Sequence, residues 1–453
     1  MLLLSKKPFL VGPVVLMLLA SSCASYRREA LDQPSNLASP AIGAVIAADA
    51  ATINRPYLRP TALDLSRPLD ANAIATLAVL FNSDLAAARL RAGVADAQAF
   101  AAGLLPDPTF SFGADKVLSG PDTYLGLSSS LGLNLAALRT RSVARQQATA
   151  EARRVRLDLA WAEWQTAGQA RLQAARIQAL ERTIAIAAAS RDATEALLGR
   201  MLRAAGRGDI LPDQVQGARV AAFDAADRLR TAQKDLETAR SELVRLVGLA
   251  PGFPLRLAAS VSPPQPPDAA TLYRIAVRER TDLQALRAGY AAQEAAVHKA
   301  VLDQFPTLDL TFNGARDTAN NVTLGPAVAF TLPIWNRNRG GIAIERATRT
   351  ALRAEYQARL LQTRAEIAAA VNGLGILGAQ RAALVEALPP LERFAAASRR
   401  AANRGDLPLA TATTAEQALR DKQILLAQAD RDIGEQTIAL ELLTGVLQQA
   451  WTG

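Results

Sequence analysis

The sequence repeats itself once at a constant spacing, and this duplication limits the folds that are open to it. Four landmarks recur at an offset of 197 or 198 residues, for example 282 minus 84. They are an Asp-Leu pair (84 and 282), a Pro-Thr pair (108 and 306), a Gly-Asp pair (208 and 405) and a glycine (248 and 445). Because the spacing holds over almost the whole chain, the sequence predicts two similar units in succession.

Each unit has the same order of predicted elements. A helical segment is followed by two strands, then by a very long helix, a glycine break and a second helix of roughly 35 residues. The first helical segments span about 70–103 and 268–304, and the long helices span about 137–205 and 341–402. At 1.5 Å per residue a long helix would reach roughly 100 Å, which is far more than a globular domain requires.

Alternation with a period of two identifies the strands. In 124–135 and 322–332, large apolar side chains hold one parity and small or polar side chains hold the other, which is typical of a strand and not of a helix. Shorter alternating runs near 108–113 and 306–312 precede them, so each unit has a strand pair. The apolar parity includes Leu125, Leu127, Leu131, Leu133, Leu308, Leu310, Val328 and Phe330.

The strands have the length and patterning of outer-membrane strands, which run about 9–11 residues with apolar groups outward. No second set of strands is predicted that would cover the apolar face, so we expect these eight residues to face lipid. Four strands cannot close a barrel, and lipid does not tolerate an open sheet edge. The barrel must then be shared between chains: two chains would give a filled barrel, whereas three would leave a lumen, so a channel favours a homotrimer.

Pro326 lies inside the predicted strand 322–332. Proline has no N–H to contribute to a strand ladder. We therefore expect a bulge or a strand end at this position.

The N-terminus has the pattern of an export signal. Lys6 and Lys7 precede an apolar run from Phe9 to Ala20, and small residues lead to Cys23, the only cysteine. The pattern predicts a signal peptide and resembles a bacterial lipoprotein signal, in which this cysteine becomes lipid-modified, for example with palmitate. The alternative is an ordinary signal peptide with an incidental cysteine. The predicted divisions are a signal peptide (1–22), a lipid-anchored linker (23–68), a first repeat (69–251), a Pro-rich connector (252–268) and a second repeat (269–453).

The composition argues against catalysis and against nucleic acid as a partner. The formal charge of +9 would suggest nucleic acid as a partner. The arginines alternate with acidic residues along helices, however, and this favours solvated helix faces. One Cys excludes an internal disulfide, and one His and three Met leave few soft metal ligands. A G-x-G-x-x-G match at 373–378 lies inside a helical repeat and so does not predict a nucleotide site. We expect no enzyme activity, no cofactor and no metal site.

The duplicated helix–strand–strand–helix order, the segment "LPIWNRNRGG" (332–341) after the fourth strand, and the two "RGD" turns resemble the TolC family of outer-membrane efflux ducts. The resemblance implies a mainly α fold with a small β part, in which four strands per chain join a twelve-stranded transmembrane barrel of a homotrimer. It also implies that long coiled-coil-like helices form an α-barrel through the periplasm. The implied partners are a periplasmic membrane-fusion adaptor and an inner-membrane efflux pump.

The turns at the glycine breaks are the candidate adaptor-docking tips, because glycine allows another backbone to approach closely. They comprise Arg207, Gly208, Asp209, Arg404, Gly405 and Asp406. We expect the two aspartates to cap the helices that follow. The sequence thus predicts a passive outer-membrane duct of a tripartite efflux pump that exports drugs or metal cations. The alternative is a coiled-coil lipoprotein that spaces or scaffolds the envelope without a pore.

Overall fold

The structure is a computed structural model, and it describes residues 26–31, 49–65, 67–122, 124–249, 251–253, 255–258 and 266–451. The chain divides into a first unit that ends at Ala41 and a second unit from Ile42 to Gly453. All features described below belong to the second unit. The predicted signal peptide and Cys23 lie outside the described residues.

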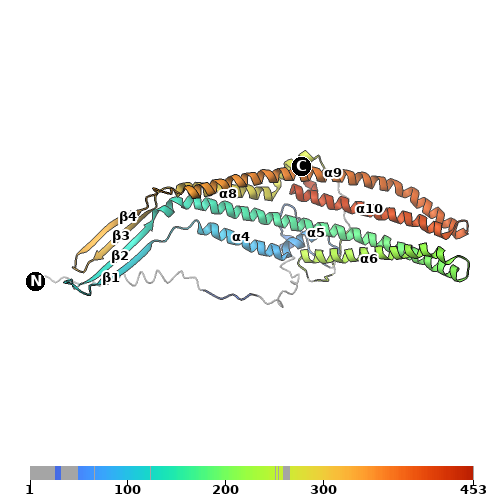
Figure 1. Cartoon of the computed structure of the whole chain (residues 1–453), viewed down its shortest axis with the longest axis horizontal. Helices are drawn as coiled ribbons and strands as arrows, with labels where there is room; N and C mark the ends of the chain where they lie inside the picture. The colour runs from blue at the N-terminus through green and yellow to red at the C-terminus, as the bar shows by residue number, and fades with distance from the viewer. Residues whose placement is uncertain are drawn as a thin grey trace. The chain divides into compact units, whose positions relative to one another are not determined.

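Both repeats contain the same helices and strands in the same order (Figure 1). A 3-10 turn lies before the last helix in the first repeat and after the last helix in the second. The first has α3 (Ala71–Phe81), α4 (Ser83–Ala101), β1 (Thr109–Lys116), β2 (Leu125–Asn134), α5 (Leu135–Gly206), the 3-10 turn η2 (Pro212–Gln214) and α6 (Val215–Leu246). The second has α7 (Ala269–Glu279), α8 (Thr281–Leu302), β3 (Leu308–Arg316), β4 (Val322–Phe330), α9 (Arg339–Arg404), α10 (Leu409–Thr444) and the 3-10 turn η3 (Gln448–Ala450). The predicted mainly helical fold with a small β part is confirmed.

The first helical segment of each repeat is not one helix, which corrects the sequence-based expectation. Asn82 separates α3 from α4 with an extended ψ of 122°, and its side chain accepts a hydrogen bond from the Leu85 N–H at 3.0 Å. The Asn82 amide also donates to the Leu246 carbonyl at the end of α6 (3.1 Å). Asn82 therefore ends α3, caps α4 and binds the end of α6.

Arg280 occupies the equivalent break between α7 and α8. Its side chain is 1% exposed, donates to the Leu443 carbonyl near the end of α10 (3.1 Å) and pairs with Asp282 (2.7 Å). The guanidinium also lies 4.7 Å from the centre of the Trp161 ring, a cation–π contact. The two repeats thus use different side chains, an amide and a guanidinium, to fix the same junction.

The helices continue the sheet as a single layer. The strand order is β1-β2-β3-β4, and α4, α5, α8 and α9 lie side by side in the matching order (Figure 1). α6 packs along α5, and α10 packs along both α9 and α5. The outer members of the layer are β1 and β4 in the sheet and α4 and α9 among the helices.

The largest buried cluster lies where α3 meets α5 and α6. Ile74 and Leu77 of α3 are fully buried in it. Leu257 of the predicted connector also packs there and forms a parallel bridge with Leu69, where the Ala258 N–H donates to the Leu69 carbonyl at 2.8 Å. Leu63 of the predicted linker joins the same cluster. The end of the predicted linker around Leu63 and the described connector around Leu257 are therefore packed structure, because their apolar side chains complete the core.

A buried carboxylate ties the start of the described second unit to the helix layer. Glu163 of α5 is 2% exposed and accepts from Arg55 (2.6 Å) and from Arg89 of α4 (2.7 Å). Burial by itself would raise the pKa of Glu163, but the hydrogen bonds from Arg55 and Arg89 outweigh it, so the pKa lies below its usual value. The ionised carboxylate is thus the stable form in the folded chain.

We predict that Glu163→Gln lowers the free energy of unfolding by about 1–3 kcal/mol at pH 7, because two guanidinium groups lose a charged partner. A carboxyl group whose pKa is lowered by folding stabilises the folded state fully at pH values above its unfolded pKa of about 4.3. This contribution is lost as the pH falls through the folded pKa. The gap in melting temperature between wild type and variant, followed by circular dichroism, should therefore be full at pH 7 and narrow below about pH 4. A gap that does not change with pH would contradict this.

Candidate functional site: an amphipathic sheet and two hairpin tips

The pairing of the four strands places all eight predicted lipid-facing residues on one face of the sheet. Cross-strand partners point to the same side, and Leu133, Leu310 and Val328 form one such row. Leu308 pairs with Phe330 in the next row. Leu131 lies between Phe110 and Phe312, two aromatic residues that the sequence-based set omitted. That these side chains face lipid stays a prediction.

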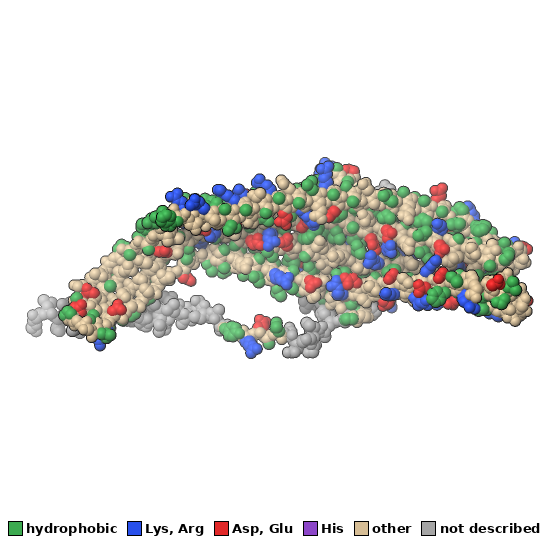
Figure 2. All heavy atoms as spheres, in the orientation of Figure 1, with side chains coloured by type: hydrophobic (Ala, Val, Ile, Leu, Met, Phe, Trp, Pro, Cys, Tyr) green, Lys and Arg blue, Asp and Glu red, His purple; other side chains and the backbone are tan. Residues whose placement is uncertain are grey.

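The apolar face ends toward the loops that join the strands. The row of Leu127 contains Arg316, and Leu125 pairs with Lys116. The Arg316 guanidinium lies 6.0 Å from the centre of the Tyr124 ring. Charged and aromatic side chains of this kind flank the apolar band of outer-membrane barrels. Figure 2 shows acidic side chains at this end of the sheet and charged side chains over the helices.

Small and polar side chains occupy the opposite face. Ser111 pairs with Ser130, and their hydroxyl oxygens lie 2.7 Å apart. The row of Gly132 contains Thr109 and Thr311. This face has little apolar surface to bury and is suited to contact with water. Leu131 and Ser130, which are neighbours in sequence, therefore sit in opposite environments.

Pro326 lies in the middle of β4, which corrects the expectation of a bulge or a strand end. It pairs with Phe312, and the β3–β4 register runs without interruption from Leu308↔Phe330 to Arg316↔Val322. Proline is tolerated here because β4 is an edge strand of the sheet, so one of its sides lacks a partner within the chain.

The two hairpin tips have the same backbone structure. Each long helix ends with a glycine of positive φ, +78° at Gly208 and +85° at Gly405. Asp209 N–H donates to the Ala204 carbonyl and Gly208 N–H to the Ala205 carbonyl, and the second tip repeats this pattern. This is the Schellman arrangement, which satisfies the last carbonyls of a helix.

The aspartates of the tips do not cap the following helices, contrary to the sequence-based expectation. Asp209 pairs with Arg207 and Asp406 pairs with Arg404, each at 2.8 Å. The pairing prevails because each arginine lies two residues before the aspartate, on the same exposed turn. The η2 turn before α6 is closed by Gln214, whose side chain accepts from the Leu211 N–H at 3.1 Å. Both Arg–Gly–Asp turns are thus rigid loops that present an exposed ion pair.

Polar contacts join the two hairpins near their tips. The Ser190 hydroxyl of α5 donates to the side-chain carbonyl oxygen of Gln417 of α10 at 2.5 Å. Arg228 of α6 pairs with Asp421 of α10 at 3.2 Å. These contacts fix the α5–α6 hairpin beside the α9–α10 hairpin.

One described helix, α9, is apolar enough by length and composition to cross a membrane, with a mean hydropathy of 1.3 over its best 18-residue window. The bent pair α3 and α4 would count as a second candidate. Only 17% of the α9 window is buried within the chain. The exposed apolar side chains of α9 include Leu361 and Ile376, and the exposed ones of α4 include Leu90 and Val94. Both outer helices of the layer therefore carry uncovered apolar surface.

The part of the chain that the structure describes offers no cluster of metal ligands. No group of three or more His, Cys, Asp or Glu side chains there is placed to hold a metal ion. The segment 373–378 lies within α9 and follows no strand.

A sheet with one apolar face that passes into long helical hairpins defines a class of protein, the outer-membrane efflux channels. The model of the outer membrane efflux protein family matches residues 272–446, within the second repeat. The resemblance to this family that the sequence indicated is thereby confirmed over the matched residues. A comparison with curated proteins finds no match.

Solved structures show the same fold over most of the chain. The CmeC outer membrane channel of Campylobacter jejuni is 14% identical with a TM-score of 0.69, over 84% of this chain and 86% of CmeC. The outer membrane protein VceC of Vibrio cholerae is 18% identical with a TM-score of 0.67, over 83% of this chain and 96% of VceC. The open state of the MtrE outer membrane channel of Neisseria gonorrhoeae is 16% identical with a TM-score of 0.62, over 82% and 88%.

We predict that Leu131→Arg costs about 2–4 kcal/mol if the site lies near the bilayer midplane, because the charge would enter lipid. Ser130→Arg, one residue away on the polar face, is the matched control and should be much milder. The measurement is the melting temperature and yield of the protein extracted from outer membranes. The reverse order of damage would show that the two faces are inverted.

Proposed function

We propose that three copies of this chain form a passive duct through the outer membrane and the periplasm. The observation that carries the proposal is the open four-stranded sheet with one apolar face. Among the described residues of one chain, β1 and β4 are both free edges, and free edges are not tolerated in lipid. If β4 of one copy pairs with β1 of the next, both edge strands gain a hydrogen-bonded neighbour. Three copies would give twelve strands with the small and polar face toward a water-filled lumen.

The helix layer supports the same assembly. α4 and α9 lie at its two edges and expose apolar side chains, such as Leu90 and Leu361. If β4 meets the β1 of a neighbour, then α9 meets the neighbour's α4 directly below. The exposed apolar surfaces of the two edges would cover each other, at a gain of about 25 cal/mol per Å² of apolar surface buried. The rival function, a spacer without a pore, has no use for an amphipathic sheet.

The duct would work between partners that the family resemblance implies. An inner-membrane efflux pump would deliver the exported solute, and a periplasmic membrane-fusion adaptor would seal against the hairpin tips. The two identical Arg–Gly–Asp turns of each chain would give six equivalent turns in a trimer. Rigid Schellman turns without side chains at Gly208 and Gly405 allow another backbone to come close. Recognition of the solute, a drug or a metal cation, would then rest with the pump.

We also propose that Cys23 carries a lipid that anchors the chain in the outer membrane. The support is its place as the only cysteine, directly behind a signal-like apolar run. Radiolabelled palmitate should enter the wild type and not Cys23→Ala. The variant should still assemble, because the barrel strands do not depend on the anchor. Equal labelling of both proteins would exclude the modification.

The docking role of the tips is tested by Gly208→Leu combined with Gly405→Leu. Leucine is strained at a positive φ, at a cost of about 1–2 kcal/mol per site, and its side chain would stand between the turn and a partner. We expect trimers that migrate anomalously on unheated denaturing gels, as in the wild type, while export and crosslinking to the adaptor are lost.

The control for the tips is Gly217→Leu. It adds the same side chain to an exposed position of α6, which has ordinary helical backbone and an open surrounding space. This variant should export normally. Wild-type export by the double tip variant would leave the glycines as turn residues only.

A further inference from the structure

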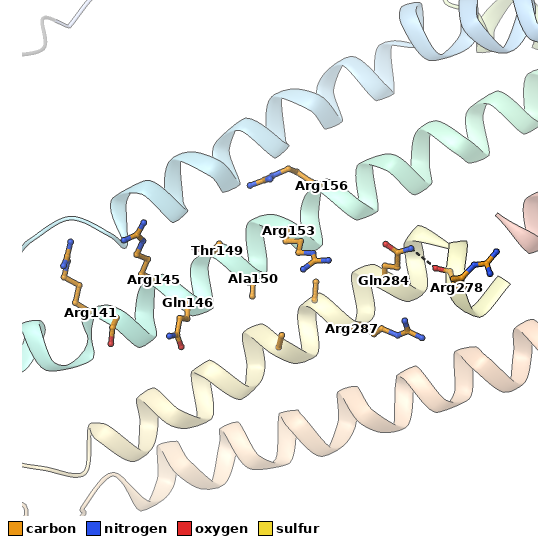
Figure 3. Close-up of a pocket in the computed structure, with 13 residues that line it drawn as sticks. Arg141, Arg145, Gln146, Thr149, Ala150, Arg153, Arg156, Arg278, Gln284 and Arg287 are labelled. Atoms are coloured by element: carbon orange, nitrogen blue, oxygen red, sulfur yellow. Dashed lines mark hydrogen bonds between the residues drawn. The ribbon is translucent and has the colours of Figure 1, made fainter. Parts of the chain in front are cut away.

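A groove between α5 and α8 is lined by arginines and contains no acidic side chain. Its volume is about 1110 Å³, and thirteen residues line it (Figure 3). The six arginines among them are Arg141, Arg145, Arg153, Arg156, Arg278 and Arg287. Alanines, such as Ala150 and Ala288, form apolar parts of the lining. We call this feature the arginine groove.

Most of this charge is not neutralised by the residues that the structure describes. Arg156 pairs with Asp96 at 2.8 Å and Arg278 with Glu279 at 2.6 Å. Arg141 donates to the Gly103 carbonyl, and Arg287 donates to the Tyr356 hydroxyl at 2.8 Å, so both hydrogen bonds leave the positive charge in place. In the described part of the chain, Arg145 and Arg153 are exposed and have neither an ion pair nor a hydrogen bond.

The arginine groove opens on the side of the layer that carries α3. Ser142, Thr149 and Arg156 line it and precede Glu163 of α5 by successive steps of seven residues, so they lie on one helix face. Ala170, one further step along, packs against α3 in the buried cluster. A duct needs its lumen free, so α3 must lie on the outside of the barrel. This step rests on the proposed trimer and places the arginine groove on the outer, periplasmic surface.

The arginine groove is also elongated and lies away from lipid. Arg141 and Arg156 are 6 and 21 residues from Leu135, the first residue of α5. At 1.5 Å per residue the arginine positions extend from roughly 10 Å to 30 Å beyond the end of the sheet. A headgroup layer adds only about 5–8 Å to the hydrocarbon core on each side. An anionic lipid headgroup would therefore approach only the Arg141 end of the arginine groove and leave most of it empty.

We propose that the arginine groove is the docking site of an acidic, amphipathic helix or extended segment of a periplasmic partner protein. Charge complementarity selects carboxylates, which guanidinium groups bind bidentately. The alanines between the arginines accept the apolar side of the segment. The two parallel walls, α5 and α8, provide the groove in which a third helix packs. The site is separate from the hairpin tips, so this partner and the adaptor do not compete.

The test uses a double charge reversal in the full-length protein. Arg145→Glu with Arg153→Glu reverses the charge of these two arginines without breaking a hydrogen bond or an ion pair among the described residues. The matched control is Arg182→Glu with Arg200→Glu, two exposed arginines of the same helix α5 that also lack partners among the described residues. Both variants change the net charge equally, so the control measures non-specific attraction.

The probe is a labelled synthetic helix of about 20 residues (about 30 Å) with an alanine stripe flanked by glutamates. We expect saturable binding to detergent-extracted wild type and about tenfold or greater weakening in the groove variant, from the loss of two charge-assisted contacts. The control should bind as the wild type does. Equal weakening in both variants, or no saturable binding, would overturn the proposal.

Two further measurements separate other occupants. Inorganic polyphosphate or phosphatidylglycerol vesicles that bind more tightly than the peptide, with the same dependence on Arg145 and Arg153, would overturn a protein partner. A change in the ion selectivity of single channels in the groove variant alone would show that the arginine groove faces the lumen. Export through the intact pump should persist in the groove variant, so failure here leaves the proposed duct untouched.

Discussion

The rest of the structure depends on one constraint, the unsatisfied backbone edges of a four-stranded sheet whose one face is apolar. Within a chain, β1 and β4 have no second neighbour, and the sheet passes directly into α5 and α9. In the proposed membrane setting every backbone N–H and C=O must find a partner. In that setting a single chain cannot close the sheet and so cannot function as a monomer. Closure of the barrel would then also set the spacing of the helices that follow the strands.

The break within the first helical segment is stabilised in both repeats, with different chemistry in each. Asn82 and Arg280 stand at equivalent breaks, and both donate to a carbonyl at the end of the second helix of their repeat. The neutral Asn82 amide makes this bond without a charged partner. The buried Arg280 guanidinium also needs Asp282 and the Trp161 ring. The backbone geometry is conserved between the repeats because the fold requires it, while the side chains that satisfy it differ.

In the proposed duct, function is distributed along the chain by distance from the membrane. The sheet would contact lipid, the helix layer would form a wall, and the tips lie at the far end of helices of 72 and 66 residues. The arginine groove adds a surface between these ends. Its unpaired charge is the feature that the assembly of a duct does not explain, since neither a lipid-facing sheet nor the hairpin contacts use it.

The sequence by itself determined the periodic features. Alternation gave the strands and their faces, glycines gave the ends of α5 and α9, and matched landmarks gave the repeat, because each depends on local backbone geometry. Tertiary structure decided what depends on partners distant in sequence. Asp209 pairs with Arg207 instead of capping a helix, Leu257 bridges Leu69, and arginines spread over α5, α7 and α8 converge on one groove. From sequence alone, a charged residue on a helix is predicted to face solvent, because its neighbouring helix is not known. Only the packed layer shows which charged residues have a partner.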